Sequence, residues 1–499
     1  MTVLYALAML LLLLFGVNLL FLAIGFANAD GLLEGDVADP SGTTDSRVND
    51  ADLPSITVQL PIYNERYVVE RLIDACASLD YPADRLDIQV LDDSTDDTVN
   101  IAEQRVAFWK KRGVRILHIR RSDRSGFKAG ALQKGLSFSN AEYVAVFDAD
   151  FVPQSDFLKR VVSRFDSNDI GMIQARWGHL NEDHSLLTRI QAFGLDTHFV
   201  IEQRVRNLTG CFINFNGTAG IWRRKCIDDS GGWSADTLAE DLDLSYRAQL
   251  RGWRFKFLPQ TVAPAELPVE MNAFRAQQFR WTKGTTQTAL KMLFPLWKSE
   301  QPLPIKLEGT IHLTAHIAFP MVLLITLFHA PLLYLNGTTG SPGSLYFELL
   351  SVGFVGFAGF FLAQLLAQRD LHVDWKRRML LFPLFLAGSM GLSFSNTRAV
   401  LEALAGKRSA FVRTPKYDVD LIGTSRKGVK AANATYSNPK ILSIVWIEVA
   451  LLLYSVAGLS WLIGSGHWVA VPFQAIIVLG FALVVTFSLR TEGAPKPGG

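Results

Sequence analysis

The chain has 499 residues, of which 49% are hydrophobic, and its mean hydropathy of +0.20 is too high for an ordinary soluble protein of this length. The 49 Lys and Arg residues nearly balance the 47 Asp and Glu residues, so no basic surplus indicates nucleic-acid binding. Three cysteines without metal-ligand spacing, Cys76, Cys211 and Cys226, argue against a disulfide framework and fit a reducing compartment.

The first segment, residues 1–29, is predicted to be a transmembrane helix. A cleaved signal peptide is the alternative, because Ala27 and Ala29 give an A-x-A end. However, no positive charge precedes the apolar run, and that run is longer than a typical signal core. Residues 30–54, rich in Asp, Gly, Ser and Thr, are predicted to form a flexible linker.

Residues 55–270 alternate short apolar strands with amphipathic helices, which predicts a doubly wound α/β domain. The strands are "SITVQLPIY", "DIQVLDD", "VRILHIR", "YVAVFDAD" and "IGMIQARW", the last of which closes the series. Ligands of such sheets bind beyond the carboxyl ends of the strands. Two strands end there in acidic pairs, Asp92-Asp93 and Asp148-x-Asp150.

Two longer amphipathic helices, at about 186–208 and 272–293, border the apolar half of the chain. The pattern fits helices at a membrane interface, although a buried domain helix gives the same pattern. We assign the second of them to an interfacial segment, residues 271–300.

Five apolar stretches follow, and the Lys- and Arg-rich segments between them predict their topology. Both 368–378 and 397–440 are basic and belong in the cytosol, so the short stretch between them cannot be a single crossing. The prediction is five crossings in all, with the N-terminus outside and the C-terminus inside. The segments are transmembrane helices two and three at 306–370, an interfacial or re-entrant helix at 379–405, a cytosolic loop at 406–440, transmembrane helices four and five at 441–489, and a tail at 490–499.

The strand-end motif "VFDAD" offers Asp148 and Asp150 as ligands for Mg2+ or Mn2+, which bind carboxylates together with substrate phosphates. The alternative is an aspartate that caps the next helix. At the end of the second strand, Asp92 and Asp93 can bind a nucleotide base or ribose. Lys128, at a helix start, suits a phosphate, and a solvated lysine is the alternative.

Two helices carry the remaining candidates. Asp241 and Asp243 lie in the first turn of one, where acidic residues favour the helix dipole or where one can act as a general base. In "QQFRWTKG", Gln277, Arg280 and Trp281 share one helix face. Arg can clamp a diphosphate and Trp can stack on a sugar, whereas the alternative is a membrane anchor.

Taken in order, these motifs resemble a known family. Pro61–Glu65 (P-x-Y-N-E), D-D at 92–93, K-A-G-A-L at 128–132, D-x-D at 148–150, E-D at 240–241 and Q-x-x-R-W at 277–281 are similar to the motifs of membrane-bound family 2 glycosyltransferases of the cellulose synthase superfamily. The phrases "QVLDDSTDDT", "RSGFKAGAL" and "AQQFRWTKG" resemble the cellulose-synthase-like A and C branch, which makes β-mannan, glucomannan and β-glucan backbones.

The resemblance implies a cytosolic GT-A catalytic domain, a nucleotide-diphospho-sugar donor and a divalent cation, Mg2+ or Mn2+. It implies these roles: general base, Asp241; nucleotide and donor binding, Asp92, Asp93, Lys128, Asp148 and Arg280; metal, Asp150 with Asp148; acceptor binding, Gln277, Trp281, Asn216 and Glu240. Ala239 stands where the family has a threonine, which leaves the glutamate and the base in place.

"FVRTPKYD" resembles the F-x-V-T-x-K gating loop of cellulose synthases, with Phe411, Thr414 and Lys416 in place and Arg413 instead of the valine. No PilZ-like domain follows, so direct activation by cyclic di-GMP is not supported.

The resulting prediction is an inverting, processive β-hexosyltransferase that polymerises glucose from UDP-glucose or mannose from GDP-mannose and moves the product across the bilayer. The alternative is an enzyme that adds one sugar to a membrane lipid, like ceramide glucosyltransferase; a transporter or scaffold with a degenerate enzyme domain is a third possibility. The expected location is a bacterial inner membrane, or the Golgi or plasma membrane of a eukaryote. Donor, linkage and oligomeric state stay open.

Overall fold

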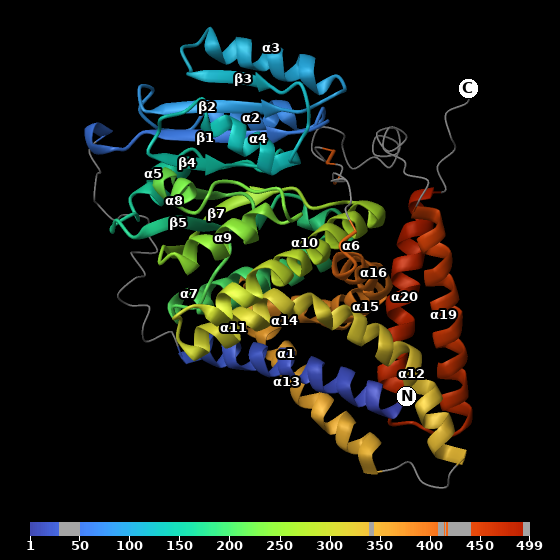
Figure 1. The fold of residues 1–499 in the computed structure, drawn as a ribbon. Coiled ribbons are helices and arrows are strands. Elements are labelled where there is room, and N and C mark those ends of the chain that lie inside the picture. The colour runs from blue at the N-terminus through green and yellow to red at the C-terminus, as the bar shows by residue number, and fades with distance from the viewer. Residues whose placement is uncertain (29–49, 339–343, 408–413, 415, 418–440, 493–499) are drawn as a thin grey trace, which may run out of the picture.

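The computed structural model describes residues 1–28, 50–338, 344–407, 414, 416–417 and 441–492. The predicted linker lies almost entirely outside these residues, as do most of the predicted cytosolic loop and of the tail. Figure 1 shows an α/β domain at one end and a group of long helices at the other, with α10 (Met271–Lys298) between them.

A seven-stranded sheet forms the α/β domain, in the order β3-β2-β1-β4-β6-β5-β7. Its strands are β1 (Ile56–Ile62), β2 (Leu86–Asp92), β3 (Ile116–Arg120), β4 (Tyr143–Val146), β5 (Ile170–His179), β6 (Gly220–Arg223) and β7 (Arg254–Ala265). The first four are parallel, as predicted. Helices α2 (Val69–Ala77), α3 (Thr98–Lys110), α4 (Phe127–Leu136) and α5 (Phe157–Val162) connect consecutive strands from β1 to β5.

The sheet departs from a purely parallel one at β6, which runs antiparallel between β4 and β5. The series therefore does not close with "IGMIQARW", because β6 and β7 follow it. Strand β6 is only four residues long. Strand β7 contains Pro259, where its register with β5 shifts, and Pro264 near its end. Short length and internal prolines both weaken a strand pattern in the sequence.

Both faces of the sheet are covered. Alternate residues of β1, such as Val58 and Leu60, pack with α2, α3 and α5 on one face. On the other face, Val144 and Val146 of β4 pack with α4, α8 (Arg224–Asp229) and α9 (Glu240–Leu250). Burial on both faces explains why the strands read as continuous apolar runs.

The remaining helices form the apolar half of the molecule. They are α1 (Thr2–Asn28), α11 (Leu303–Thr314), α12 (Ala318–Thr338), α13 (Ser344–Leu371), α14 (Trp375–Arg378), α15 (Phe382–Gly391), α16 (Ser393–Leu404), α19 (Ile441–Gly464) and α20 (Val471–Glu492). The predicted helix 186–208 is present as α6 (Leu186–Thr197), the π-helix η4 (His198–Gln203) and α7 (Arg204–Leu208).

Four helical stretches of the described residues are long and apolar enough to cross a membrane: Thr2–Asn28, Leu303–Leu335, Ser443–Gly464 and Val471–Leu489. A fifth, Trp375–Gly391 with Ser393–Leu404, is bent by 45° at its break. This bent pair covers the predicted interfacial segment and has the form of either a broken span or a re-entrant loop. The five-crossing topology itself stays a prediction.

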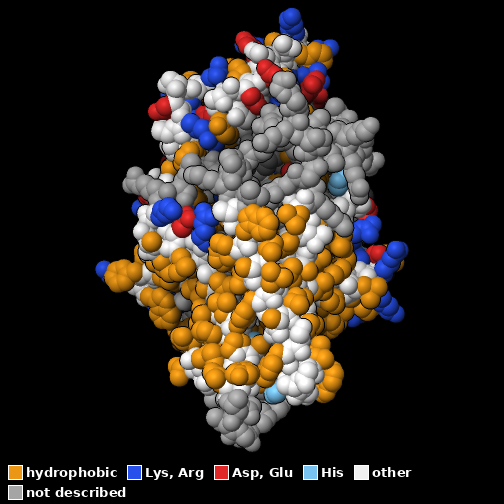
Figure 2. All heavy atoms as spheres, turned by 90° about the vertical axis from the view of Figure 1, so that its right-hand side faces the viewer, with side chains coloured by type: hydrophobic (Ala, Val, Ile, Leu, Met, Phe, Trp, Pro, Cys, Tyr) orange, Lys and Arg blue, Asp and Glu red, His pale blue; other side chains and the backbone are white. Residues whose placement is uncertain are grey.

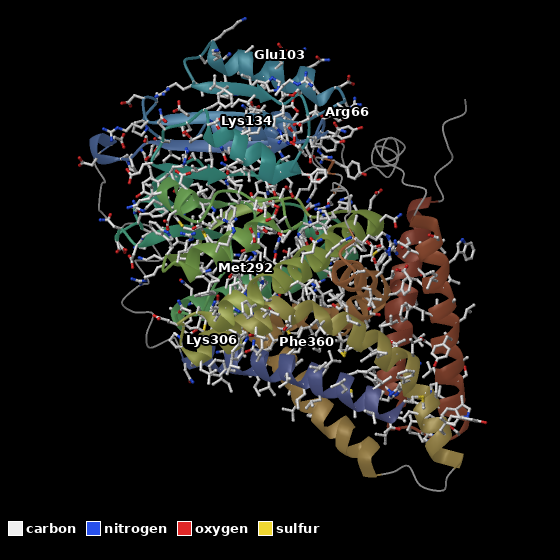
Figure 3. The ribbon with its side chains drawn as sticks, viewed as in Figure 1. Arg66, Glu103, Lys134, Met292, Lys306 and Phe360 are labelled. Atoms are coloured by element: carbon white, nitrogen blue, oxygen red, sulfur yellow. The ribbon has the colours of Figure 1, made fainter. Side chains whose placement is uncertain are left out.

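Large hydrophobic side chains remain exposed on these helices. Figure 2 shows them as a broad apolar face on the side of α19 and α20, with charged side chains gathered toward the α/β domain. Examples are Val3 of α1, Phe354 of α13, and Trp446 and Leu453 of α19. In the view of Figure 3, Arg66, Glu103 and Lys134 project from the α/β domain, whereas Phe360 lies among the apolar helices. An apolar surface of this extent indicates a membrane protein.

A buried polar cluster joins the α/β domain to the helices beneath it. Asp196 of α6 accepts hydrogen bonds from His372 Nε2 (3.0 Å), Gln368 Nε2 (3.1 Å) and Arg378 (3.3 Å), and it lies 3.2 Å from His179 Nε2. Burial raises the pKa of Asp196, but the hydrogen bonds from His179 and His372 outweigh it and hold the pKa below its usual range.

Asp196→Asn is expected to destabilise the protein by about 3 kcal/mol, because it leaves buried cationic and polar partners without their counter-charge. Thermal unfolding of the purified full-length protein in detergent measures the loss. The matched control is Asp183→Asn. Asp183 pairs with Arg189 at 3.0 Å, but its side chain is 90% exposed, so we expect almost no change. Equal unfolding midpoints for both variants would contradict the role of the cluster.

Candidate active site

The site is an open cavity beyond the carboxyl ends of β1, β4 and β5, closed on one side by α9 and α10. This is the edge at which the sequence places the ligand of such a sheet. Of the residues predicted from the sequence, the following line the cavity: Asp93, Lys128, Asp148, Asp150, Asn216, Glu240, Asp241, Gln277, Arg280, Trp281, Thr414 and Lys416. Asp92 is not among the lining residues, and Phe411 lies outside the described residues.

The two aspartates after β4 each face a lysine. Lys128 Nζ lies 2.6 Å from Asp148 Oδ1, and Lys416 Nζ lies 2.6 Å from Asp150 Oδ2. The backbone N–H of Asp148 donates to the Thr218 hydroxyl at 2.9 Å, which fixes the turn. Burial raises the pKa of Asp148, and the nearby Lys128 only partly opposes this.

This donor set fits a divalent cation that is shared with a substrate. Two carboxylates on one strand end are what Mg2+ or Mn2+ takes when substrate phosphates and water supply the other ligands. Among the described residues, no group of three His, Cys, Asp or Glu side chains is placed to hold a metal alone. A cation at Asp150 would take the place of the Lys416 ammonium.

Asp241 is the second residue of α9, and its carboxylate faces the loop that carries Asn216. Gly217 of that loop has a φ of +82°, and a Cβ there would lie 2.8 Å from Asp241 Oδ2. Only glycine lets the loop approach the carboxylate this closely. Burial, with the charge of Glu240, raises the pKa of Asp241 to about 7, against the lowering effect of Lys128.

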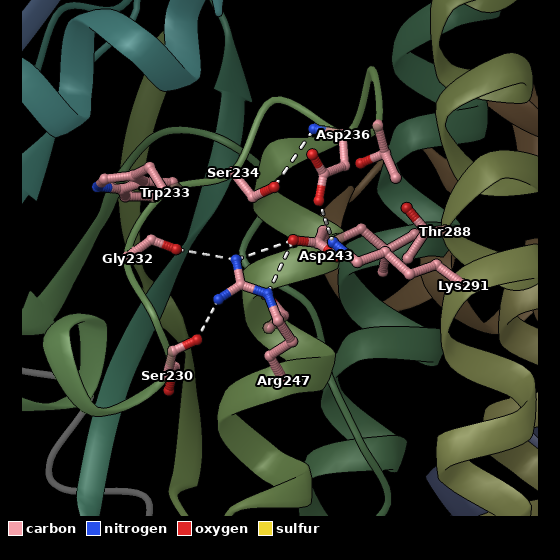
Figure 4. A network of polar contacts seen from close by, with 12 residues as sticks. Ser230, Gly232, Trp233, Ser234, Asp236, Asp243, Arg247, Thr288 and Lys291 are labelled. Atoms are coloured by element: carbon pink, nitrogen blue, oxygen red, sulfur yellow. Dashed lines mark hydrogen bonds and ion pairs between the residues drawn. The ribbon is translucent and has the colours of Figure 1, made fainter.

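Asp243, the other acidic candidate on this helix, points away from the cavity. Figure 4 shows its carboxylate held by the guanidinium of Arg247 and the ammonium of Lys291, at 2.8 Å from each. Lys291 of α10 also pairs with Asp236 at 3.1 Å. Asp243 therefore fixes α9 against α10, and Asp241 is the residue of this pair that reaches the cavity.

Lys128 lies at a helix start, as the sequence predicts, and its role as a phosphate ligand stays a prediction. It is the second residue of α4, and its ammonium reaches across the cavity to Asp148, to Glu240 at 3.7 Å and to the carbonyl of Gly217 at 2.8 Å. Burial lowers its pKa, but the carboxylates of Asp148 and Glu240 outweigh this and raise it. Lys128 thus holds the carboxylates of Asp148 and Glu240 together.

The two aspartates at the end of β2 have different surroundings. The carboxylate of Asp92 is buried, accepts from the backbone N–H of Ser94 (2.7 Å) and lies 2.8 Å from His118 Nε2. The carboxylate of Asp93 lines the cavity and accepts from Arg121 Nε at 2.8 Å. The structure therefore places the Asp92 carboxylate outside the cavity lining, between Ser94 and His118.

Helix α10 brings Gln277, Arg280 and Trp281 to the cavity on one face, as their spacing predicts. Arg280 Nη1 donates to the Thr414 hydroxyl at 2.9 Å. Burial lowers the pKa of Arg280 to about 10, so the guanidinium is still charged near neutral pH. The same helix is anchored toward the membrane half by Arg275, which pairs with Glu448 of α19 at 2.7 Å.

Thr414 and Lys416, predicted from the gating-loop resemblance, are both buried in the site. The Lys416 ammonium also donates to the carbonyl of Glu266, and the backbone N–H of Tyr417 donates to Glu266 Oε1 at 3.0 Å. Asn216 Nδ2 lies 2.9 Å from His198 Nε2, on the π-helix. A π-helix next to a cavity often marks a functional position.

Several lining residues were missed from the sequence. Arg124 lies 3.3 Å over the ring of Tyr63, and both line the cavity, as Asp93 does. Trp177 and His179, at the end of β5, line the opposite part of the cavity. The sequence held a signal for three of them. Tyr63 lies inside the P-x-Y-N-E motif, and Trp177 and His179 are two residues apart at the end of a strand, which places them on one face of it.

The mixed sheet, the Asp-x-Asp after β4 and the acidic helix start beside it define a GT-A glycosyltransferase domain. The fold is also that of the mannosyltransferase PcManGT from Pyrobaculum calidifontis, solved with GDP-Man and Mn2+. That structure matches with a TM-score of 0.50 and 19% identity over 80% of this chain and 100% of its own. At this identity the likeness concerns the fold alone.

Residues 54–284 match the family model described as "Glycosyltransferase like family 2". Similar proteins are glucomannan 4-beta-mannosyltransferase 2 of Arabidopsis thaliana, 44% identical over 52% of this chain and 49% of its own length, and glucomannan 4-beta-mannosyltransferase 1 of Oryza sativa subsp. japonica, 41% identical over 53% and 51%. The chain thus spans about half the length of these curated relatives.

Proposed function

We propose that this protein is an inverting β-hexosyltransferase that extends a β-mannan or glucomannan chain from a nucleotide-diphospho-sugar and passes the product into the membrane. The observation that carries the proposal is that Asp241 and Lys128 line the same cavity as Arg280 and Trp281, which are consecutive residues of α10. The mannosyltransferase relatives favour GDP-mannose over UDP-glucose as donor. The relatives are plant proteins, so a bacterial inner membrane gains no support from them.

In the proposed reaction, an acceptor hydroxyl attacks the anomeric carbon opposite the leaving nucleoside diphosphate. Asp241 accepts the hydroxyl proton, the bond from the anomeric carbon to the diphosphate oxygen breaks, and the diphosphate keeps the electron pair. Arg280 stabilises the charge that develops on the leaving group. One displacement inverts the anomeric configuration, so an α-linked donor yields a β-glycoside.

Asp148 and Asp150 would hold Mn2+ or Mg2+ together with the donor diphosphate. The metal, when bound, supplies Lewis-acid stabilisation of the leaving diphosphate. Support comes from the two carboxylates at the cavity wall and from the Mn2+ in the PcManGT structure.

The test uses membranes that contain the full-length protein and, separately, radiolabelled GDP-mannose or UDP-glucose, with Mn2+, with Mg2+ or with EDTA. We expect mannose incorporation that depends on a divalent cation and yields a product that resists lipid extraction and is digested by endo-β-mannanase. A labelled product that dissolves in organic solvent and carries one sugar would replace the proposal with the glycolipid alternative. Membranes with Asp241→Asn are the background control.

A further inference from the structure

The end of β5 presents two side chains to the cavity that no part of the proposed reaction uses. Strand β6 pairs with β5 only at residues 172–174, whereas β7 continues along β5 as far as His179. One edge of residues 176–179 therefore has no neighbour among the strands of the described residues, and it borders the cavity. Trp177 and His179 lie two residues apart, on the same face of the strand, and both line the cavity.

The ring of Trp177 is held by three aromatic neighbours. Phe151 and Phe199 lie with ring centroids 5.3 Å from it, and Trp281 of α10 lies at 6.4 Å with an angle of 53° between the ring planes. His179 is held as well, by the buried Asp196. The indole rings of Trp177 and Trp281 thus form two adjacent, preorganised walls of the cavity, which we call the corner.

Trp177 also carries a polar group without a protein partner. Its indole Nε1 is buried and has no hydrogen-bond partner among the described residues. Buried indole N–H groups normally find an acceptor. Because this N–H is buried, a ligand in the cavity would meet Trp177 at the part of its ring that stays exposed, and the C–H face of a neutral pyranose packs on an indole face.

We propose that Trp177 is an acceptor-binding residue, and that with Trp281 it forms a subsite for a neutral pyranose of the acceptor glycan. This rests on the proposed function, because the acceptor is taken to be a β-linked hexose chain. The corner consists of uncharged aromatic side chains, so it suits a sugar ring and not the diphosphate. The donor meets its partners elsewhere in the cavity, near Asp93, Asp148 and Arg280.

The test is Trp177→Leu in the purified full-length protein, with mannohexaose as acceptor and GDP-mannose as donor. We expect the KM for mannohexaose to rise about tenfold, with the KM for GDP-mannose unchanged and kcat within about threefold. The matched control is Trp253→Leu. Trp253 lies outside the cavity and its indole N–H donates to Asp229 at 2.9 Å, so both KM values should stay at the wild-type level.

An unchanged KM for mannohexaose in folded Trp177→Leu overturns the proposal, as does an equal rise of KM for both substrates. Should this variant not fold, Trp177→Phe keeps an aromatic ring among Phe151, Phe199 and Trp281 but presents a smaller face to the sugar. It is then expected to raise the KM for mannohexaose alone, and wild-type values would again overturn the proposal.

Titration of mannohexaose without donor, followed by tryptophan fluorescence, separates this inference from the proposed function. If the wild type transfers no sugar, the proposed function fails. Saturable binding of mannohexaose that is lost in Trp177→Leu and kept in Trp253→Leu would still support the subsite. Absence of binding in the wild type, or equal binding in Trp177→Leu, would overturn it.

Discussion

Asp241→Asn is expected to reduce sugar transfer by about 10³-fold while the affinity for the nucleoside diphosphate stays near the wild-type value. An amide cannot accept the proton of the acceptor hydroxyl. It can still accept the hydrogen bond that the backbone N–H of Leu242 donates to Asp241 Oδ1 at 2.8 Å, so the start of α9 is preserved. Initial rates with radiolabelled donor, and calorimetric titration with GDP, measure the two quantities.

The matched control for this variant is Asp243→Asn, on the same helix. Asp243 is buried between Arg247 and Lys291 and does not reach the cavity, so its loss should lower the unfolding temperature and leave kcat of the folded protein unchanged. The opposite pattern, with transfer retained in Asp241→Asn, would remove Asp241 as the general base.

Much of the fold was predictable because its early part is locally determined. Strands β1, β2 and β4 are buried on both faces, so each appears in the sequence as an apolar run followed by a helix. Asp93 and Asp148 follow the carboxyl ends of two parallel strands, and these ends lie at the one edge of the sheet where ligands bind. Strand β6 gave no comparable signal, because four residues inserted antiparallel between β4 and β5 depend on tertiary pairing.

The sequence predicted which residues line the site better than it predicted the ion pairs that these residues form. Spacing on one helix placed Gln277, Arg280 and Trp281 together. The ion pair of Asp150 with Lys416 joins segments far apart in the chain, and no local pattern encodes it. Lys128 shows the same limit, since its position at a helix start suggested a phosphate, whereas its ammonium contacts Asp148 and Glu240.

The contacts of Lys128 lead to the second large expected effect. The ammonium lowers the pKa of Asp241, which burial and Glu240 raise to about 7. A general base acts in its deprotonated form, and the deprotonated fraction grows as the pH rises through the pKa. For the wild type, kcat/KM should therefore increase about tenfold per pH unit below this value and level off above it.

Lys128→Met is expected to move this inflection upward by about one to two pH units, because Asp241 loses the positive charge that lowers its pKa, while the charge of Glu240 that raises it remains. At neutral pH, transfer should fall by about 5- to 50-fold, and part of the loss should return as the pH is raised. The matched control, Lys134→Met, changes an exposed lysine of the same helix and should keep the wild-type profile. If Lys128 acts instead by binding the donor phosphate, the KM for GDP-mannose will rise and the inflection will stay in place. That result would contradict a charge-balancing role, since the carboxylates that Lys128 contacts are the physical reason for the predicted shift.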